Sequence, residues 1–224
     1  MKNKLYLNLA IICYILSILI LFSIRSVLNT NIRLALLSIV CVLIYISGFI
    51  LIKKLNYNKK ILKVNLIIYF LIYTITIFYL TLFDEIYGRQ GFIVIEWDKK
   101  LLNTYLTNSF NIVPFKTIKL FVYGYINQIV SFKSFCINII GNIVAFMPFG
   151  LFLPLIFKKI NRYYKFLIVM LLSVLLIEIL QFITMSGTCD IDDLILNLIG
   201  ASIVYWIINI KCINKLIKKI FLYE

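Results

Sequence analysis

Long stretches without a single charged residue constrain the fold of this chain more than any other feature. Leu5–Ile24 and Val64–Phe83 are each 20 residues long, and Leu34–Ile52 has 19 residues. A helix of about 20 apolar residues covers the hydrocarbon thickness of a bilayer. Such segments must be helical in lipid, because no water is present there to satisfy an open backbone. The sequence therefore predicts an all-α, polytopic membrane bundle.

Three more apolar spans follow in the second half of the chain, which makes about six in total. Pro148 and Pro154 lie in the fourth span, so we expect this helix to be kinked or broken into half-helices. The predicted spans are Leu5–Ile24, Leu34–Ile52, Val64–Phe83, Ile137–Phe157, Phe166–Met185 and Asp193–Ile210.

The composition excludes an ordinary soluble protein. The chain is 63% hydrophobic and 14% charged, which leaves too little polar material to cover a soluble domain. The net charge of +14 would suggest nucleic-acid binding in a soluble protein. Here the basic residues lie between apolar runs, so we interpret them as topology signals and headgroup anchors, and expect no nucleic-acid partner.

The distribution of basic residues predicts an orientation. With a cytoplasmic N-terminus, 15 of the 23 Lys and Arg residues fall on the inner side. This bias favours a multi-pass protein of the plasma membrane with both termini in the cytoplasm. Seven acids then lie on or at the border of the outer side: Asp84, Glu85, Glu96, Asp98, Asp190, Asp192 and Asp193.

The polar residues divide the chain into regions of different character. We expect a two-helix anchoring region at residues 1–63 and a membrane domain at 64–210. This domain contains four helices and an outer segment at 84–136, and a basic cytoplasmic tail follows at 211–224.

Apart from Asp193 at the start of the last one, Glu178 is the only acidic or basic residue inside a predicted span, and we interpret it as a catalytic or site residue. A charge at that depth costs roughly 2.5 kcal/mol or more, so it is expected to face the bundle interior. Gln181 lies at i+3 on the same face. The structural alternative is a buried, protonated glutamate that is bonded to Gln181 for helix packing.

The start of the last span carries a polar stripe. Asp190, Asp193, Asn197 and Gly200 are spaced by 3, 4 and 3 residues, which places them on one helical face. We assign Asp190 and Asp193 catalytic roles and Asn197 a ligand-binding role. The alternative is that one or two of the aspartates cap the helix; Asp192 lies off the stripe. Gly200 would let a neighbouring helix approach closely.

Further polar residues precede the fourth span and lie at its start. Asn138 and Asn142 share a helical face and are candidate ligand-binding residues, although they could also be hydrogen-bonding glue between helices. Asn111 and Lys116 come before them, in a segment whose part near 118–130 is apolar enough to lie in the membrane interface as a helix. Together with Arg89, these residues would line an outward-facing cavity.

Four segments, in this order and with apolar helices between them, resemble the VanZ-like family. They read NIVPFKTI, NIIGNIVAFMPFG, EILQF and DIDDLILNLIGA, and TLFDEIYGR before them resembles the end of that family's third helix. The resemblance covers about residues 79–206. The residues that it carries over are Asn111, Pro114, Phe115, Asn142, Phe146, Pro148, Gly150, Glu178, Gln181, Asp190, Asp193 and Asn197.

The resemblance implies a role in the bacterial cell envelope, with the prototype associated with teicoplanin resistance. Many members place an Arg shortly before the final aspartates, whereas this chain has MSGTC there, so that cation is absent unless Arg89 or Lys116 supplies it.

Several functions are compatible with these residues. The protein could bind an envelope lipid, a cell-wall precursor or a lipoglycopeptide at the outer leaflet. It could also modify such a ligand, with Glu178 as acid or base and aspartates holding a divalent cation. A small-solute or ion transporter and a non-catalytic scaffold or immunity-type protein are the alternatives. His is absent and no metal signature is present, so no metal site is assigned, and the sequence specifies neither a cofactor nor an oligomeric state.

Overall fold

The computed structural model describes residues 2–23, 30–55, 60–83, 99–184 and 187–217. The chain divides into two compact units. Unit 1 comprises Met1–Ile72 with Lys218–Glu224, and unit 2 comprises Tyr73–Ile217. The boundary between the units falls inside the third long helix, α3 (Lys60–Leu82).

Six helical stretches within the described residues are long and apolar enough to cross a membrane, which confirms the predicted all-α membrane bundle. Their centres coincide with the predicted spans, and their ends differ from them by a few residues. They are Asn3–Ser23, Ala35–Ile52, Ile61–Leu82, Phe132–Ile156, Tyr163–Thr184 and Ile191–Asn209.

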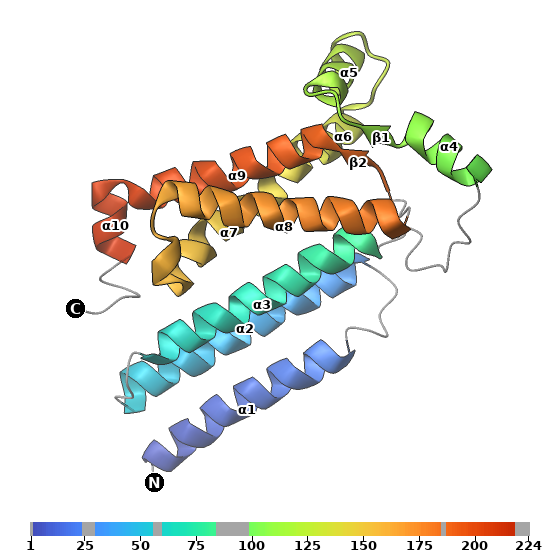
Figure 1. The fold of residues 1–224 in the computed structure, drawn as a ribbon. Helices are drawn as coiled ribbons and strands as arrows, with labels where there is room; N and C mark the ends of the chain where they lie inside the picture. Colours follow the sequence, from blue (N-terminus) through green and yellow to red (C-terminus); the bar gives the residue numbers. More distant parts are fainter. Residues whose placement is uncertain (1, 24–29, 56–59, 84–98, 185–186, 218–224) are drawn as a thin grey trace. The chain divides into compact units, whose positions relative to one another are not determined.

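Unit 1 contains α1 (Lys2–Ser23), α2 (Thr30–Leu55) and the first part of α3 (Figure 1). Asn65 of α3 joins these three helices, because it accepts a hydrogen bond from Tyr14 at 2.8 Å and donates one to the Ile44 carbonyl at 3.3 Å. A methyl group at Gly48 would lie 2.3 Å from the Asn65 amide nitrogen. The few polar groups of these spans therefore hold helices together.

Unit 2 contains the end of α3, three further spanning stretches and the segments that connect them (Figure 1). After α3, its elements are α4 (Lys99–Asn108), β1 (Phe110–Asn111), α5 (Lys116–Ile126), α6 (Phe132–Phe135), the π-helix η3 (Cys136–Ile140), α7 (Gly141–Ile156), the 3₁₀-helix η4 (Lys158–Ile160), α8 (Tyr163–Thr184), β2 (Cys189–Asp190), α9 (Ile191–Asn209) and α10 (Lys211–Ile217).

Helices α7 and α9 form the main packing interface of unit 2. A methyl group at Gly200 would lie 1.9 Å from the Ile143 carbonyl oxygen, and one at Gly150 would lie 2.2 Å from the Ala201 carbonyl oxygen. Each helix thus contributes a glycine where the other backbone approaches, as predicted for Gly200. The later residue of α7, Gly150, meets the later residues of α9, Ala201 and Tyr205, whereas the earlier Ile143 meets Gly200. Helices α7 and α9 therefore run parallel and begin at the same end of the unit.

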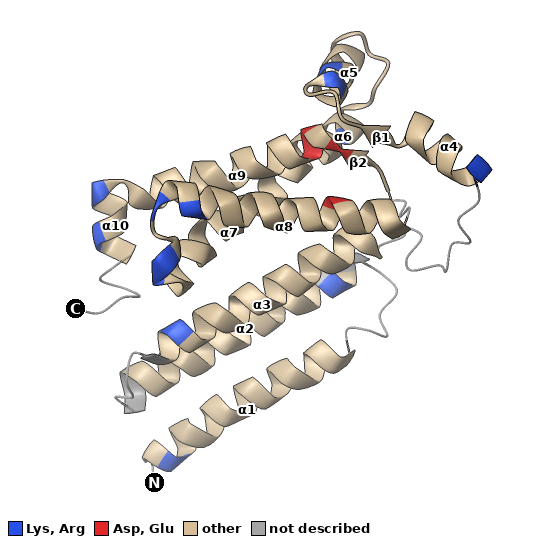
Figure 2. Cartoon of the chain, viewed as in Figure 1, with Lys and Arg blue, Asp and Glu red and all other residues tan. Residues whose placement is uncertain are grey.

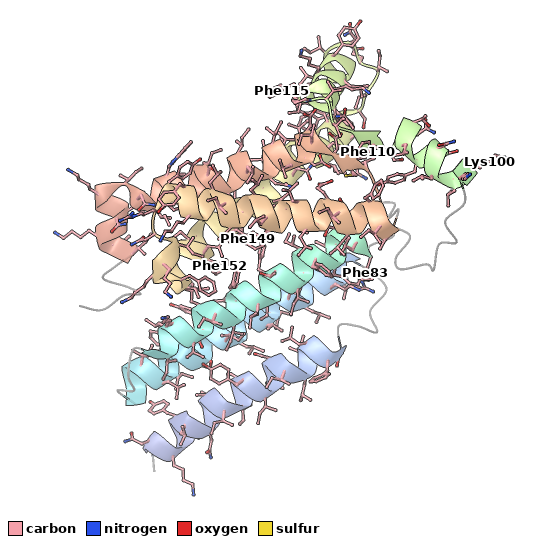
Figure 3. All side chains as sticks on the ribbon, viewed as in Figure 1. Phe83, Lys100, Phe110, Phe115, Phe149 and Phe152 are labelled. Atoms are coloured by element: carbon pink, nitrogen blue, oxygen red, sulfur yellow. The ribbon has the colours of Figure 1, made fainter. Side chains whose placement is uncertain are left out.

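The fourth span is irregular at its start. Four α-helical residues and the five-residue π-helix η3 precede α7, which then continues through both Pro148 and Pro154. The prolines therefore do not break the span into half-helices. The Tyr73 hydroxyl donates to the Ala145 carbonyl at 2.6 Å, in the turn before Pro148. The Tyr73 ring also lies close to the rings of Phe149 and Phe152, both labelled in Figure 3.

A two-residue parallel pairing ties the connecting segment to the start of α9. Phe110 of β1 pairs with Cys189 of β2, and Asn111 pairs with Asp190. This pairing holds α5 at the end of unit 2 where α9 begins (Figure 1). Helix α5 covers most of the segment that was expected to form an interfacial helix.

Candidate functional site

The polar side chains of unit 2 gather at the end where α7 and α9 begin and α8 ends. The described acids of the chain all belong to this unit and colour this end red in Figure 2. We call this group the polar cluster. It consists of Asn111, Thr117, Asn142, Glu178, Asp190, Asp192 and Asp193.

Asp192 is fully buried and holds the start of α5. Its carboxylate accepts hydrogen bonds from the backbone N–H groups of Phe115, Thr117 at 2.7 Å and Ile118 at 3.0 Å. Phe115, labelled in Figure 3, has a left-handed backbone with φ 65° immediately before the helix. The N–H groups of Phe115, Thr117 and Ile118 thus converge on one carboxylate, whereas the Lys116 N–H donates to the Val113 carbonyl at 3.3 Å.

Asp190 fixes the same turn through its side chain. Its carboxylate accepts hydrogen bonds from the Asn111 amide at 2.8 Å and from the Thr117 hydroxyl. It also caps α9, because it accepts the Asp192 N–H at 2.9 Å. Asn111 and Asp190, both predicted as site residues, are therefore brought into direct contact.

Glu178 lies beneath this turn, in the last part of α8. Its side chain is 7% exposed and accepts the Asp190 backbone N–H at 3.1 Å. The Cys189 thiol also hydrogen-bonds to Glu178. Burial, together with the negative charges of Glu178, Asp190 and Asp193, raises the pKa of Cys189 to about 11. Cys189 is thus a protonated thiol at neutral pH, surrounded by carboxyl groups.

Asp193 connects α9 to α7. The Asn142 amide donates to the Asp193 carboxylate and to the Asn138 carbonyl at 3.0 Å. The hydrogen bond between Asn142 and Asp193 joins α7 to α9. It has the helix-packing role that the sequence analysis gave as the alternative for Asn138 and Asn142. Asn138 itself donates to the Ser134 carbonyl at 2.8 Å, within its own helical segment.

Asn197 continues the polar stripe one turn further along α9. It lies between Asp193, which contacts Asn142, and Gly200, which contacts Ile143, so it faces α7. The residue is 5% exposed, and its Oδ1 atom has no hydrogen-bond partner among the described residues. A buried acceptor without a donor costs about 1–3 kcal/mol, so this atom requires a bonding partner from outside the described residues.

The remaining predicted site residues are spread more widely. Gln181 is buried, but its amide donates to the Thr81 carbonyl of α3 at 2.9 Å, so it serves helix packing. Lys116 is exposed at the first position of α5. Arg89 lies outside the described residues.

Sequence reasoning underrated two side chains of the cluster. Asp192 was set aside because it lies off the helical stripe, and Thr117 was not singled out. One signal was present in the sequence. Lys116 and Thr117 lie next to a predicted helix start, and the free N–H groups at a helix start need an acceptor. Within the described residues, no three His, Cys, Asp or Glu side chains are grouped so that they could hold a metal ion.

Comparison with known proteins identifies the family of the chain. The sequence profile of the VanZ/LLP1 family matches residues 70–212, which include nearly all of unit 2. Protein VanZ of Enterococcus faecium is 46% identical over 63 residues, which are 28% of this chain and 38% of that relative. The match therefore spans well under half of the relative's length. No solved structure matches the chain. Because the family profile covers more than half of its residues, the chain belongs to the VanZ/LLP1 family.

Proposed function

We propose that this protein binds the polar part of an envelope lipid, a cell-wall precursor or a lipoglycopeptide at the polar cluster, on the outer side of the plasma membrane. One observation carries the proposal. Three spanning helices and the turn before α5 direct carboxylates, amides and a hydroxyl to the same end of unit 2. Binding sites for small polar ligands in apolar surroundings combine few polar groups in this way.

The chemistry of the cluster suits a ligand rich in N–H and O–H groups. Most donors and acceptors of the cluster already bond to one another, which holds them in position before any ligand arrives. Asn197 supplies the acceptor that lacks a partner among the described residues. A lipoglycopeptide or a cell-wall precursor offers amide and hydroxyl donors in number, and its lipid part would remain among the apolar faces of the helices.

A ligand-binding experiment tests this proposal. Purified protein in detergent should bind teicoplanin or lipid II, measured by microscale thermophoresis, and Asn197→Ala should weaken the binding by about tenfold, the effect of losing one buried hydrogen bond. Asn209→Ala is the matched control, because Asn209 is an exposed residue at the other end of the same helix. Equal binding by both variants and the wild type, or no binding by any of them, would contradict the proposal.

The same experiment separates binding from chemical modification. Glu178 is the candidate acid or base, since its side chain accepts the Asp190 N–H and lies beside the Cys189 thiol. A modified ligand would show a changed mass after incubation, and Glu178→Gln should then abolish this change while binding persists. An unchanged mass in the presence of wild-type protein restricts the function to binding.

A further inference from the structure

The segment that leaves the polar cluster forms an apolar projection, which we call the α5 arm and define as residues 112–135. Within α5, Gly124 is the one buried residue among those described, and it is covered by Val130 of the same arm. Tyr123, Ile126 and Ile129 are 66%, 71% and 74% exposed. Side chains of this size are not left in water over a whole segment, so another molecule covers the arm.

The arm is also basic. It carries Lys116, Lys119 and Lys133, which are all exposed, and the sequence contains no acid between residues 99 and 177. Lys116 and Lys119 lie three residues apart in the first turn of α5, so they are neighbours on the helix surface. Neither lysine forms an ion pair with a described carboxylate, and the acids nearby are occupied by the hydrogen bonds of the turn.

The arm is attached to the spanning helices in a defined way. Asp192 holds three N–H groups at the start of α5, and Asp190 holds Thr117 and Asn111. The two lysines of the first turn therefore have a set position relative to α9, immediately beside a membrane-spanning end.

Charge decides which molecule covers the arm. A second copy of this chain, docked arm to arm, would place three lysines against three lysines, with no acid on either arm to offset them. Anionic phospholipids supply both the apolar layer and the opposite charge. We propose that the α5 arm is a binding surface for anionic phospholipid headgroups, in which Lys116 and Lys119 contact the phosphate and Tyr123, Ile126 and Ile129 enter the acyl boundary. This proposal is independent of the ligand assigned to the polar cluster.

Tryptophan quenching tests the proposal on the full chain. Tyr123→Trp serves as the reporter after Trp97→Phe and Trp206→Phe, and the protein is reconstituted in brominated phosphatidylcholine or brominated phosphatidylglycerol. We expect quenching by both lipids and a preference for phosphatidylglycerol. Lys116→Gln and Lys119→Gln should each lower this preference by roughly fivefold or less, the surface contribution of one lysine. Lys158→Gln is the matched control, because Lys158 is exposed in η4, outside the arm.

Each other outcome overturns the proposal in a distinct way. Quenching by aqueous acrylamide without quenching by brominated lipid would place the arm in water. Equal quenching by the two lipids, unchanged by the lysine variants, would remove headgroup recognition. Energy transfer between donor- and acceptor-labelled arms at lipid dilutions that separate monomers would assign the surface to a second copy. A loss of teicoplanin or lipid II binding at the polar cluster changes none of these readouts, so the two proposals fail separately.

Discussion

At the residue scale, three neighbouring aspartates have three different bonding environments. Asp190 bonds to side chains of the turn before α5, Asp192 bonds to backbone N–H groups of α5, and Asp193 bonds to Asn142 of α7. The first two position a segment, and the third joins two spanning helices. The start of α9 therefore positions the segments around it. A ligand that binds there has to use carboxylates that also hold the structure together.

Asp192 is expected to matter most for stability. Asp192→Ala leaves three backbone N–H groups without their acceptor, and we expect a loss of about 3 kcal/mol in the free energy of unfolding. Asp192→Asn retains one acceptor oxygen and should lose less. Thermal unfolding in detergent measures the difference. A melting temperature of Asp192→Ala equal to that of the wild type would contradict the role assigned to this carboxylate.

Cys189 provides a pH readout of the same cluster. With a pKa of about 11, its thiolate fraction at pH 7 is roughly 10⁻⁴, and it grows about tenfold per pH unit until the pKa is reached. Alkylation of a variant with Cys189 as the sole cysteine should therefore be slow at pH 7 and accelerate up to about pH 11. Glu178→Gln removes a charge that raises the pKa and should shift the profile to lower pH.

The control for this profile is the same variant in denaturant, where the thiol should titrate near its ordinary pKa of about 8.5. A folded profile with that same midpoint would show that the carboxyl groups do not surround Cys189 as described. Mass spectrometry of the alkylated protein gives both rates.

Residue pairs were the hardest part to foresee from the sequence. Spacing along one helix predicted that Asp193 and Asn197 share a face, because helical periodicity is a local property, but it did not indicate that this face packs against α7. The bonds of Asp192 join residues 74 to 77 positions apart, and no local pattern encodes them. Gln181 shared a face with Glu178 as predicted, yet its amide bonds to Thr81, which lies 100 residues earlier.

At the element scale, the α7–α9 pair is the most extensive helix–helix interface of unit 2. Two glycines allow the two parallel backbones to touch, at Gly200 and at Gly150. Packing in lipid depends on such close approach, because the hydrophobic effect contributes little between helices there. This pair also sets the distance between Asn142 and Asp193, so the geometry of the polar cluster depends on the glycines below it.

Gly200→Ala should separate the two helices. The added methyl group would lie 1.9 Å from a backbone oxygen that cannot rotate away, and we expect a loss on the order of 2 kcal/mol in unfolding free energy. Gly141→Ala is the matched control, since its methyl group would meet its nearest neighbour at an ordinary 3.6 Å and alanine is the better helix former. Thermal unfolding compares them. Equal melting temperatures for the two variants would contradict the close packing.

The elements themselves were largely foreseeable. Six apolar runs predicted six spanning helices, because length and the absence of charge suffice to identify a span. The prolines were a poorer guide, because α7 continues through both of them and the irregularity lies in the π-helix η3. A π-helix changes only which backbone groups hydrogen-bond to each other. It does not change the hydropathy pattern, so the sequence did not indicate it.

At the scale of the whole molecule, the described acids of unit 2 are confined to one end. They lie at the end with α5, which also carries Lys116, Lys119 and Lys133, whereas the described charged residues at the opposite end, in η4, in α10 and around the start of α8, are all basic (Figure 2). The two ends of the spanning helices therefore differ in the surface that they offer to headgroups. The positive-inside rule predicts that the end with η4 and α10 faces the cytoplasm.

Site-directed labelling checks this orientation. In a cysteine-free background, Thr188→Cys should react with a membrane-impermeant maleimide in intact cells, because Thr188 is exposed beside the polar cluster. Lys159→Cys, exposed in η4, should react only after the membrane is permeabilised. The reverse pattern would place the polar cluster in the cytoplasm and remove the outer-leaflet part of the proposed function.

The carboxylate of Asp192 also imposes an order on biogenesis. The ribosome completes the first turn of α5 more than 70 residues before it reaches Asp192, so the nascent turn waits without the acceptor for its N–H groups. Only when the last spanning helix has been inserted can the turn at Phe115 close. A segment in the middle of the sequence is thus among the final parts to mature, and a stalled or truncated chain would expose it to quality-control proteases.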